Sequence, residues 1–413
     1  MKETTRSKRS KTFARACYLT AIVNSLVSSS HGQGTPAVIA NTTAPISSRT
    51  KGWSAEGLMR CGIFDIMPSM RTGLTYDDNI FISSSNKKSD FVWSLSPYIM
   101  LGAGDYRERE ESLLTLEYSP TVFLFTRHGS QNAVDHDAKL EGQWRGGNWT
   151  LGLEQRFSDY SGTVVDVGRR VNRQAYNTEA LVRYEISPKT AVEFNADQSI
   201  NNYDAPYNSF NEWVVGTWLD YWLTPKVRVG TGVKAGWVDV VNSANQTYQQ
   251  ALVRVSYLWS EKSELNASVG AELREFQNGS NKGDPVFSLG AKYKPFENTT
   301  ISLDGYRRNQ TSFTFVNQNY HLTGVSGTVS QLIRDRYTLS LEGGYENLKY
   351  VATSAGVVAN RRDDYAFVRV GADMDVTRRL SVGAFYLYRK NNSSVATSSF
   401  SNNQVGLTAS YAF

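Results

Sequence analysis

The sequence predicts an all-β fold, namely a transmembrane antiparallel up-and-down β-barrel of about 18 strands. Three observations predict it: strict alternation at the carboxyl terminus, regularly spaced polar turns, and the lack of long apolar runs. In the last nine residues Val405, Leu407, Ala409, Tyr411 and Phe413 form one apolar face, opposite small or polar residues. A strand with lipid on one side and water on the other needs this pattern. The alternative is a half-buried strand of a soluble sheet.

The turns recur at the spacing of long hairpins. Ile186–Thr190 and Leu223–Val227 are near copies, and their prolines, Pro188 and Pro225, are 37 residues apart. Proline suits a turn because its missing N–H is not needed there. Longer Asn/Ser/Gly-rich connections lie between the turns, at 158–172, 201–209, 309–318, 348–362 and 391–401. Short turns at one rim and long loops at the other are typical of outer-membrane barrels.

Strands placed between these connections number 18, which predicts a water-filled lumen and both termini on the periplasmic side. Lengths of about 12 to 16 residues exceed those of soluble sandwiches. We expect Pro97 and Pro120 to cause a bulge or bend in the second and third strands. The predicted spans are 69–81, 89–101, 111–126, 133–146, 148–160, 172–186, 189–201, 210–223, 226–240, 246–260, 263–277, 284–294, 297–309, 318–333, 336–348, 362–376, 379–391 and 400–413.

Membrane-spanning helices are not expected, because no run of 18 apolar residues exists and the mean hydropathy is −0.41. A barrel passes this test since only every second residue faces lipid. The 23 Tyr and 9 Trp suit aromatic girdles at the two membrane interfaces.

The amino terminus predicts secretion. Six basic residues precede a short apolar run, Ala16–Val27, and small residues follow it. We expect a signal peptide over 1–31, cleaved near Ser30 to Gly32, a periplasmic tail over 32–67 and the barrel over 68–413; a disordered basic tail is the alternative reading of the amino terminus. Lipid anchoring at Cys17 is not expected, because the preceding residues are not apolar enough.

Removing the signal segment also removes the excess of positive charge. Residues 1–30 hold six Lys/Arg and one acid, so 44 against 39 becomes 38 against 38. A near-neutral chain gives no reason to expect nucleic acid as a partner. Cys61 then remains alone and cannot form an internal disulfide.

Alternation also assigns charged side chains to the lumen. In 227–237, for example, valines and Trp237 share one face and Arg228 and Lys234 the other. Arg or Lys on the lipid face would cost roughly 2–4 kcal/mol at mid-bilayer, which forces such residues inward. The wall is then either hydrated and internally paired, or a track for a ligand. The predicted lumen residues are Lys139, Glu141, Glu154, Arg156, Arg183, Glu185, Glu193, Asp197, Arg228, Lys234, Arg254, Glu272, Arg274, Lys292, Asp304, Arg308, Glu342, Arg369 and Asp373.

Catalytic motifs are scarce. His128 and the run Asp135-His136-Asp137 are expected in one extracellular loop, where a barrel protease or a weak metal site would fit. Nucleophile, base and positioning residues match no barrel-enzyme pattern. No phosphate-binding glycine loop or paired-cysteine motif is found. We therefore predict no enzyme activity, no metal and no cofactor.

The segment Ile66–Phe81 carries a resemblance. Its Pro-Ser start and its Tyr-Asp-Asn-Ile-Phe end resemble a family of outer-membrane β-barrel porins whose genes often accompany exopolysaccharide gene clusters. The likeness would cover about residues 63 to 413, although only this motif and the closing Phe413 are specific. The resemblance implies a conduit for a secreted polysaccharide. The terminal aromatic pair, Tyr411 and Phe413, resembles the signal read by the barrel-assembly machinery.

These features predict a passive channel in the outer membrane of a Gram-negative-type bacterium, with polysaccharide export as the leading function. The alternatives are a general or oligosaccharide-uptake porin, a barrel enzyme at the outer rim, and a structural or adhesive barrel with a blocked lumen. The expected partners are outer-membrane lipid, the barrel-assembly machinery and, for export, a periplasmic export protein with its polysaccharide cargo.

Overall fold

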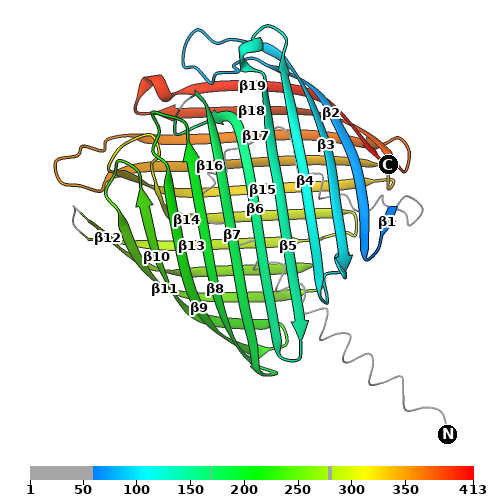
Figure 1. The fold of residues 1–413 in the computed structure, drawn as a ribbon, viewed down its shortest axis with the longest axis vertical. Helices are drawn as coiled ribbons and strands as arrows, with labels where there is room; N and C mark the ends of the chain where they lie inside the picture. The colour runs from blue at the N-terminus through cyan, green and yellow to red at the C-terminus, as the bar shows by residue number, and fades with distance from the viewer. Residues whose placement is uncertain (1–58, 168, 278–280) are drawn as a thin grey trace.

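The computed structural model describes residues 59–167, 169–277 and 281–413, which form a closed antiparallel barrel (Figure 1). The predicted signal segment lies outside the described residues. Eighteen long strands, β2 to β19, make the wall, and two short 3₁₀ turns, η3 and η4, lie between strands. The strands are β1 (Met59–Cys61), β2 (Phe64–Asp77), β3 (Asp90–Gly104), β4 (Leu113–Phe125), β5 (Ala133–Gly146), β6 (Trp149–Val164), β7 (Arg169–Ser187), β8 (Thr190–Tyr203), β9 (Phe210–Thr224), β10 (Val227–Val240), β11 (Gln246–Ser260), β12 (Ser263–Phe276), β13 (Lys282–Tyr293), β14 (Thr299–Thr311), β15 (Gln318–Ile333), β16 (Tyr337–Ala352), β17 (Arg362–Asp375), β18 (Leu380–Ser393) and β19 (Phe400–Ala412), with η3 at Gly129–Gln131 and η4 at Ala396–Ser398.

The predicted fold class is confirmed. Each strand pairs antiparallel with its neighbours in the sequence, and β19 closes the ring on β2 through pairs such as Leu407 with Leu74. The first barrel strand begins at Phe64, four residues before the predicted start of the barrel at 68. The short strand β1 pairs with the start of β2 and carries the exposed thiol of Cys61.

The connections at the two rims differ in length, but less than predicted. Turns of two residues join β5 to β6, β7 to β8, β9 to β10 and β11 to β12 at one rim. Gly147 has a φ of +58° in the first of these turns, which glycine adopts without strain. Nine connections of up to twelve residues lie at the other rim, which we call the outer mouth. The predicted loop 158–172 is wrong, since β6 and β7 occupy most of it.

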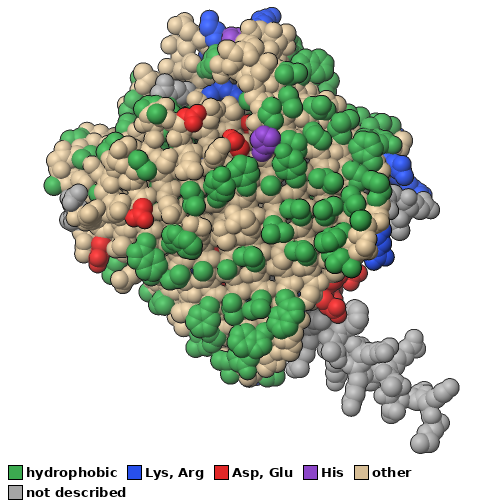
Figure 2. All heavy atoms as spheres, in the orientation of Figure 1, with side chains coloured by type: hydrophobic (Ala, Val, Ile, Leu, Met, Phe, Trp, Pro, Cys, Tyr) green, Lys and Arg blue, Asp and Glu red, His purple; other side chains and the backbone are tan. Residues whose placement is uncertain are grey.

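The outside of the wall is apolar. Side chains such as Leu219, Val233, Leu265 and Leu407 are 44–61% exposed, and they alternate with side chains on the lumen face. Figure 2 shows hydrophobic side chains spread over one side of the barrel, with most charged ones near its edges. No helix in the described part of the chain is long and apolar enough to cross a membrane. A closed barrel with this exterior is an outer-membrane structure.

The predicted irregularity at Pro97 and Pro120 is present, and its geometry is specific. The β3–β4 ladder pairs Leu95 with Val122 and Ile99 with Tyr118, which places the two prolines opposite each other. Neither can donate a backbone hydrogen bond, so the ladder is interrupted between these pairs. Hydroxyl groups connect the strands instead: Ser96 Oγ lies 2.9 Å from Thr121 Oγ1.

Candidate functional site

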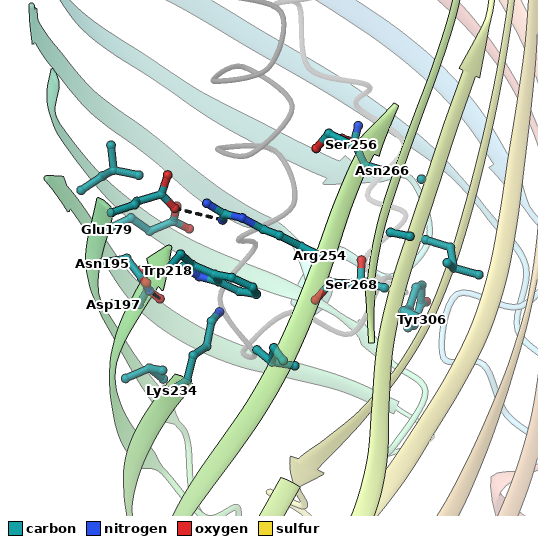
Figure 3. A pocket seen from close by; sticks show the side chains of 18 of the residues that line it. Glu179, Asn195, Asp197, Trp218, Lys234, Arg254, Ser256, Asn266, Ser268 and Tyr306 are labelled. Atoms are coloured by element: carbon teal, nitrogen blue, oxygen red, sulfur yellow. Dashed lines mark hydrogen bonds and ion pairs between the residues drawn. The ribbon is translucent and has the colours of Figure 1, made fainter. Parts of the chain in front are cut away.

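The candidate site is the lumen, which holds a cavity of about 950 Å³ lined by strands β5 to β14 (Figure 3). Its lining carries both signs of charge, as predicted for the wall. Lys292 and Asp304 are exposed on this lining, whereas many other charged lumen groups are buried. The charged lining residues are Glu141, Glu154, Glu179, Glu193, Asp197, Lys234, Arg254, Glu264, Lys292, Asp304, Arg307 and Arg308.

An ion cluster crosses the wall on the side of the cavity near the two-residue turns, and two of its members, Glu193 and Arg254, also line the cavity. We call Arg183, Glu193, Asp220, Arg228 and Arg254 the arginine cluster. Arg183 Nη1 lies 2.9 Å from both Glu193 Oε2 and Asp220 Oδ2, and Arg254 Nη2 lies 2.7 Å from Asp220 Oδ2. Arg228 Nη1 lies 3.6 Å from Asp220 Oδ2. Three cations thus share two carboxylates at near-complete burial, which fixes these side chains in place.

Tryptophans hold the same guanidinium groups from one side. Arg254 lies 4.2 Å from the ring centre of Trp218, and Arg183 lies 5.2 Å from that of Trp222. Trp218 packs flat on β10 because Gly232 has no side chain: a Cβ there would lie 2.4 Å from the Trp218 ring. Stacking on aromatic faces favours arginine over lysine at these positions.

A second polar network lies closer to the outer mouth. Arg274 Nε donates to Glu272 Oε1 at 2.7 Å, and Arg274 Nη1 donates to Gln246 Oε1 at 3.0 Å. Asn309 Nδ2 also donates to Glu272 Oε1, at 2.8 Å, from the other side of β13. Gln246 and Asn319 exchange amide hydrogen bonds of 3.0 and 2.7 Å. The end of the β14–β15 hairpin is therefore attached to β11 and β12 across the lumen.

A row of like charges crosses strands β5 to β8. Glu141, Glu154, Glu179 and Asp197 are directly opposed on the neighbouring strands β5 to β8. Such pairs destabilise a sheet unless cations offset them. Lys139 Nζ lies 3.1 Å from both Glu141 Oε2 and Glu154 Oε2 and offsets part of this repulsion.

The outer mouth is crossed by its own loops. Asp166 of the β6–β7 loop accepts hydrogen bonds from Tyr350 Oη on β16 and from Thr314 Oγ1 of the β14–β15 loop, the latter at 2.9 Å. Arg361 of the β16–β17 loop donates to the backbone oxygen of Asp166 at 2.6 Å. Strands β6 and β16 stand about half a turn of the ring apart, so these contacts span the mouth. We call these four residues the mouth hub.

Aromatic packing strengthens this closure. Phe313 of the β14–β15 loop stacks on Tyr203 of β8 at 4.3 Å between ring centres. Ile82 and Val165, from two other loops, are buried together with Phe400. Burial raises the pKa of Asp166, while the Arg361 guanidinium opposes the shift. The predicted water-filled lumen is thus a cavity beneath a packed mouth.

The structure divides most of the predicted lumen residues among three polar groups and the remaining cavity lining. The arginine cluster holds Arg183, Glu193, Arg228 and Arg254, the second network holds Glu272 and Arg274, and the acidic row holds Glu141, Glu154 and Asp197 with Lys139 beside it. Lys234, Lys292, Asp304 and Arg308 line the cavity. Arg156 pairs with Asp137 at 2.9 Å, Arg369 lies 4.8 Å from the Phe385 ring centre, and Glu185, Glu342 and Asp373 lie on β7, β16 and β17.

Sequence reasoning missed the central members of two groups. Asp220 lies between Trp218 and Trp222 on the lumen face of β9, and aromatic side chains on both faces of that strand hide its alternation. Asp166 lies in a segment predicted to be a surface loop. The signal in the sequence is the spacing of Trp218, Asp220 and Trp222, because residues two apart lie on the same face of a strand.

The predicted histidine loop is wrong, because Asp135-His136-Asp137 belongs to β5. His136 Nδ1 lies 2.9 Å from Tyr118 Oη on the outer face. His128 Nδ1 lies 2.8 Å from Asp90 Oδ2, and its ring also meets the edge of Phe81. These contacts include no serine, threonine or cysteine nucleophile. Among the described residues no cluster of three or more metal-ligating side chains is present.

No protein-family model matches the sequence, and no curated protein sequence matches it. Several solved structures are similar to this chain over most of its length. OccK2 (OpdF) of Pseudomonas aeruginosa is 11% identical with a TM-score of 0.45, and the match covers 84% of this chain and 98% of that one. OccAB3 of Acinetobacter baumannii is 9% identical (TM-score 0.45, coverage 84% and 99%), and P. aeruginosa OprD is 8% identical (TM-score 0.41, coverage 84% and 95%). These values are too low to carry any conclusion about substrate.

Proposed function

We propose that the protein is an outer-membrane channel for small hydrophilic solutes, held here with its outer mouth closed. The observation that carries the proposal is the lumen wall, on which hydrogen-bonding and charged groups of both signs surround a 950 Å³ cavity. Such a wall offers partners to sugar hydroxyls and other polar groups without a single-sign field that would select small ions. This is the uptake alternative of the sequence analysis.

Polysaccharide export is the weaker reading. A polymer needs a continuous bore, whereas the mouth hub joins opposite sides of the outer mouth and the arginine cluster occupies the wall lower down. A cavity of 950 Å³ has the size of a small-ligand site. The export reading rests on the resemblance of Ile66–Phe81 alone, and neither comparison with sequences supports it.

The test is solute entry into proteoliposomes that contain the purified barrel. Swelling rates in sugars of increasing size should show entry of mono- and disaccharides and exclusion of dextran. Arg361→Ala removes a donor from the mouth hub without touching the cavity, and we expect it to raise the rates. Exclusion of every sugar by both proteins would refute the channel. Loss of surface polysaccharide on gene deletion would favour export instead.

A further inference from the structure

The barrel wall contains a seam between β13 and β14. Their ladder runs from Phe287–Arg307 to Tyr293–Ile301, seven residue pairs, and is the shortest in the ring. Towards the outer mouth, β13 continues from Val286 to Lys282 paired with β12, and β14 continues to Thr311 paired with β15. No backbone pairing joins these two described segments to each other. Pro285 lies in the segment, as expected for a strand edge.

The departure of the β14–β15 hairpin explains the seam. Its outer end is held in the mouth by Asn317, whose Oδ1 accepts from the backbone of Ala244 at 2.8 Å, and by the Asn319–Gln246 amide pair. The hairpin therefore leaves β13 and turns inward. The same contacts that close the axial route therefore leave this side of the wall joined by side chains, such as Asp284 and His321, and not by backbone pairing.

The cavity reaches this seam. Its lining includes Val286 and Phe287 on one side and Arg307 and Arg308 on the other, which are the residues where the ladder ends. The lipid-facing neighbours Leu289 and Leu303 are about half exposed just below the seam. The seam thus begins at the outer border of the apolar belt.

Inside the seam the lumen wall carries an apolar cluster. Trp218, Leu252 and Val286 point inward from β9, β11 and β13 and form a buried cluster on the cavity lining, here called the apolar patch. The inner wall of a barrel whose lumen holds only water is expected to be polar, so an apolar patch there points to an apolar ligand. Val286 belongs both to the patch and to the seam, so the two features are contiguous.

Polar groups line the edge of the seam. His321 Nε2 of β15 lies 3.7 Å from Asp284 Oδ1 of β13, and His321 Nδ1 meets Asn309 Oδ1 of β14. Arg307 donates from Nη1 to Thr323 Oγ1 at 3.0 Å, and its buried Nε has no hydrogen-bond partner. An uncovered strand edge is tolerated at membrane depth where polar groups or a cavity serve it. The guanidinium group of Arg307 therefore provides a positive charge at the entrance to the seam.

We propose that this seam is a lateral portal through which a long-chain carboxylate passes between the outer leaflet and the lumen cavity. The chain contacts the apolar patch, and the carboxylate lies against Arg307 at the entrance. The inference goes beyond the hydrophilic channel proposed above, because this ligand enters from the membrane and not along the axis. The two routes share a cavity but differ in entrance.

The experiment uses the full barrel in lipid nanodiscs and a palmitate that carries a photoactivatable diazirine. Residue-level mass spectrometry then compares labelling of the apolar patch with labelling of lipid-facing Leu219 and Val253. We expect patch labelling that excess oleate suppresses. Pro285→Cys with Asn309→Cys, in a Cys61→Ser background, places two thiols on the two sides of the seam, and joining them with a short bifunctional thiol reagent should abolish patch labelling while the lipid face stays labelled.

The matched control is Leu289→Cys with Gly305→Cys, which cross-links the same strands where the ladder is continuous. Leu252→Ser tests the patch without altering the seam and should weaken palmitate binding on the order of tenfold, since a buried leucine loses most of its transfer free energy. Labelling confined to the lipid face, or patch labelling that survives the seam cross-link, would overturn the portal. Sugar entry measured on the same cross-linked barrel reports on the axial channel separately.

Discussion

At the scale of single residues, the lumen depends on a few acids that each serve several cations. Asp220 is fully buried and contacts Arg183, Arg228 and Arg254. Removing one partner of a buried ion group is costly because the remaining charges lose their compensation. Asp304 is exposed on the cavity lining, so we expect water to solvate its charge. The two acids therefore form a matched pair for testing the difference between structural and solvated charge.

Asp220→Asn should lower the free energy of unfolding by about 3 kcal/mol, because three guanidinium groups would then share the single carboxylate of Glu193. Asp304→Asn should change it by less than about 1 kcal/mol. Urea unfolding of the barrel in lipid vesicles, followed by tryptophan fluorescence and heat-modifiable migration, measures both. Equal stabilities for the two variants would show that the arginine cluster is hydrated and not structural.

Phe413 is the residue on which we expect assembly to depend. Its ring is about half exposed beside Tyr411, with 5.1 Å between the ring centres, at the end of the lipid-facing side of β19. Phe413→Ala should reduce the amount of folded barrel in the outer membrane, while Phe413→Trp should retain it, because an aromatic interfacial group is preserved. Heat-modifiable barrel in membrane fractions gives the measure. Wild-type levels for Phe413→Ala would make the terminal ring incidental to assembly.

At the scale of elements, the β6–β7 loop acts as a titratable closure. Asp166 faces Tyr350 of β16, Arg361 of the β16–β17 loop and Asp363 of β17. Burial raises its pKa above the ordinary 3.8, which it regains once the loop opens into water. A carboxyl group with a raised pKa in the closed form favours closure at low pH. This preference for the closed mouth is fully present below pH 3.8, and it weakens as the pH rises towards the raised pKa of Asp166.

Channel conductance should therefore increase as the pH rises from below 4 through the raised pKa of Asp166. Asp166→Asn mimics the protonated carboxyl group and should stay closed with the pH dependence removed. Asp166→Ala deletes the acceptor for Tyr350 and Thr314 and should open the mouth at every pH. Planar-bilayer recordings of the three proteins across this range decide the matter. A pH response that persists in Asp166→Asn would assign it to another group.

The facing prolines of β3 and β4 make a second element-scale test. Replacing both Pro97 and Pro120 by threonine restores two backbone donors where the ladder is interrupted. We expect the double variant to gain about 1 kcal/mol in unfolding free energy, roughly the net value of one ladder hydrogen bond. Each single variant should gain less, since the remaining proline still lacks its donor. Urea midpoints measure the series, and a destabilised double variant would mean that the bend itself is needed.

At the scale of the whole molecule, the wall could be predicted from sequence but the mouth could not. Lipid on one side imposes a two-residue period that is visible locally, as in 405–413 and 227–237. The contact of Asp166 with Tyr350 joins residues 184 apart in sequence, and no local pattern reports it. The predicted loops are also too long, because Asn and Ser side chains near strand ends form hydrogen bonds within the barrel, as where Asn201 Nδ2 donates to Ser199 Oγ.

Burial also changes which charges should control ion selectivity. On the hydrated wall that alternation predicts, Arg228, Glu272 and Arg274 would lie in water. All three are instead buried and hydrogen-bonded or ion-paired, so reversing their charges should reduce folding. Lys234 and Lys292 line the cavity and are less enclosed. Lys234→Glu and Lys292→Glu should shift the reversal potential towards cation preference in a salt gradient, with little loss of folded barrel. The wild type should be weakly selective, since its lining carries both signs. An unchanged reversal potential in both variants, recorded with the mouth opened by Asp166→Ala, would show that ions do not pass through this cavity.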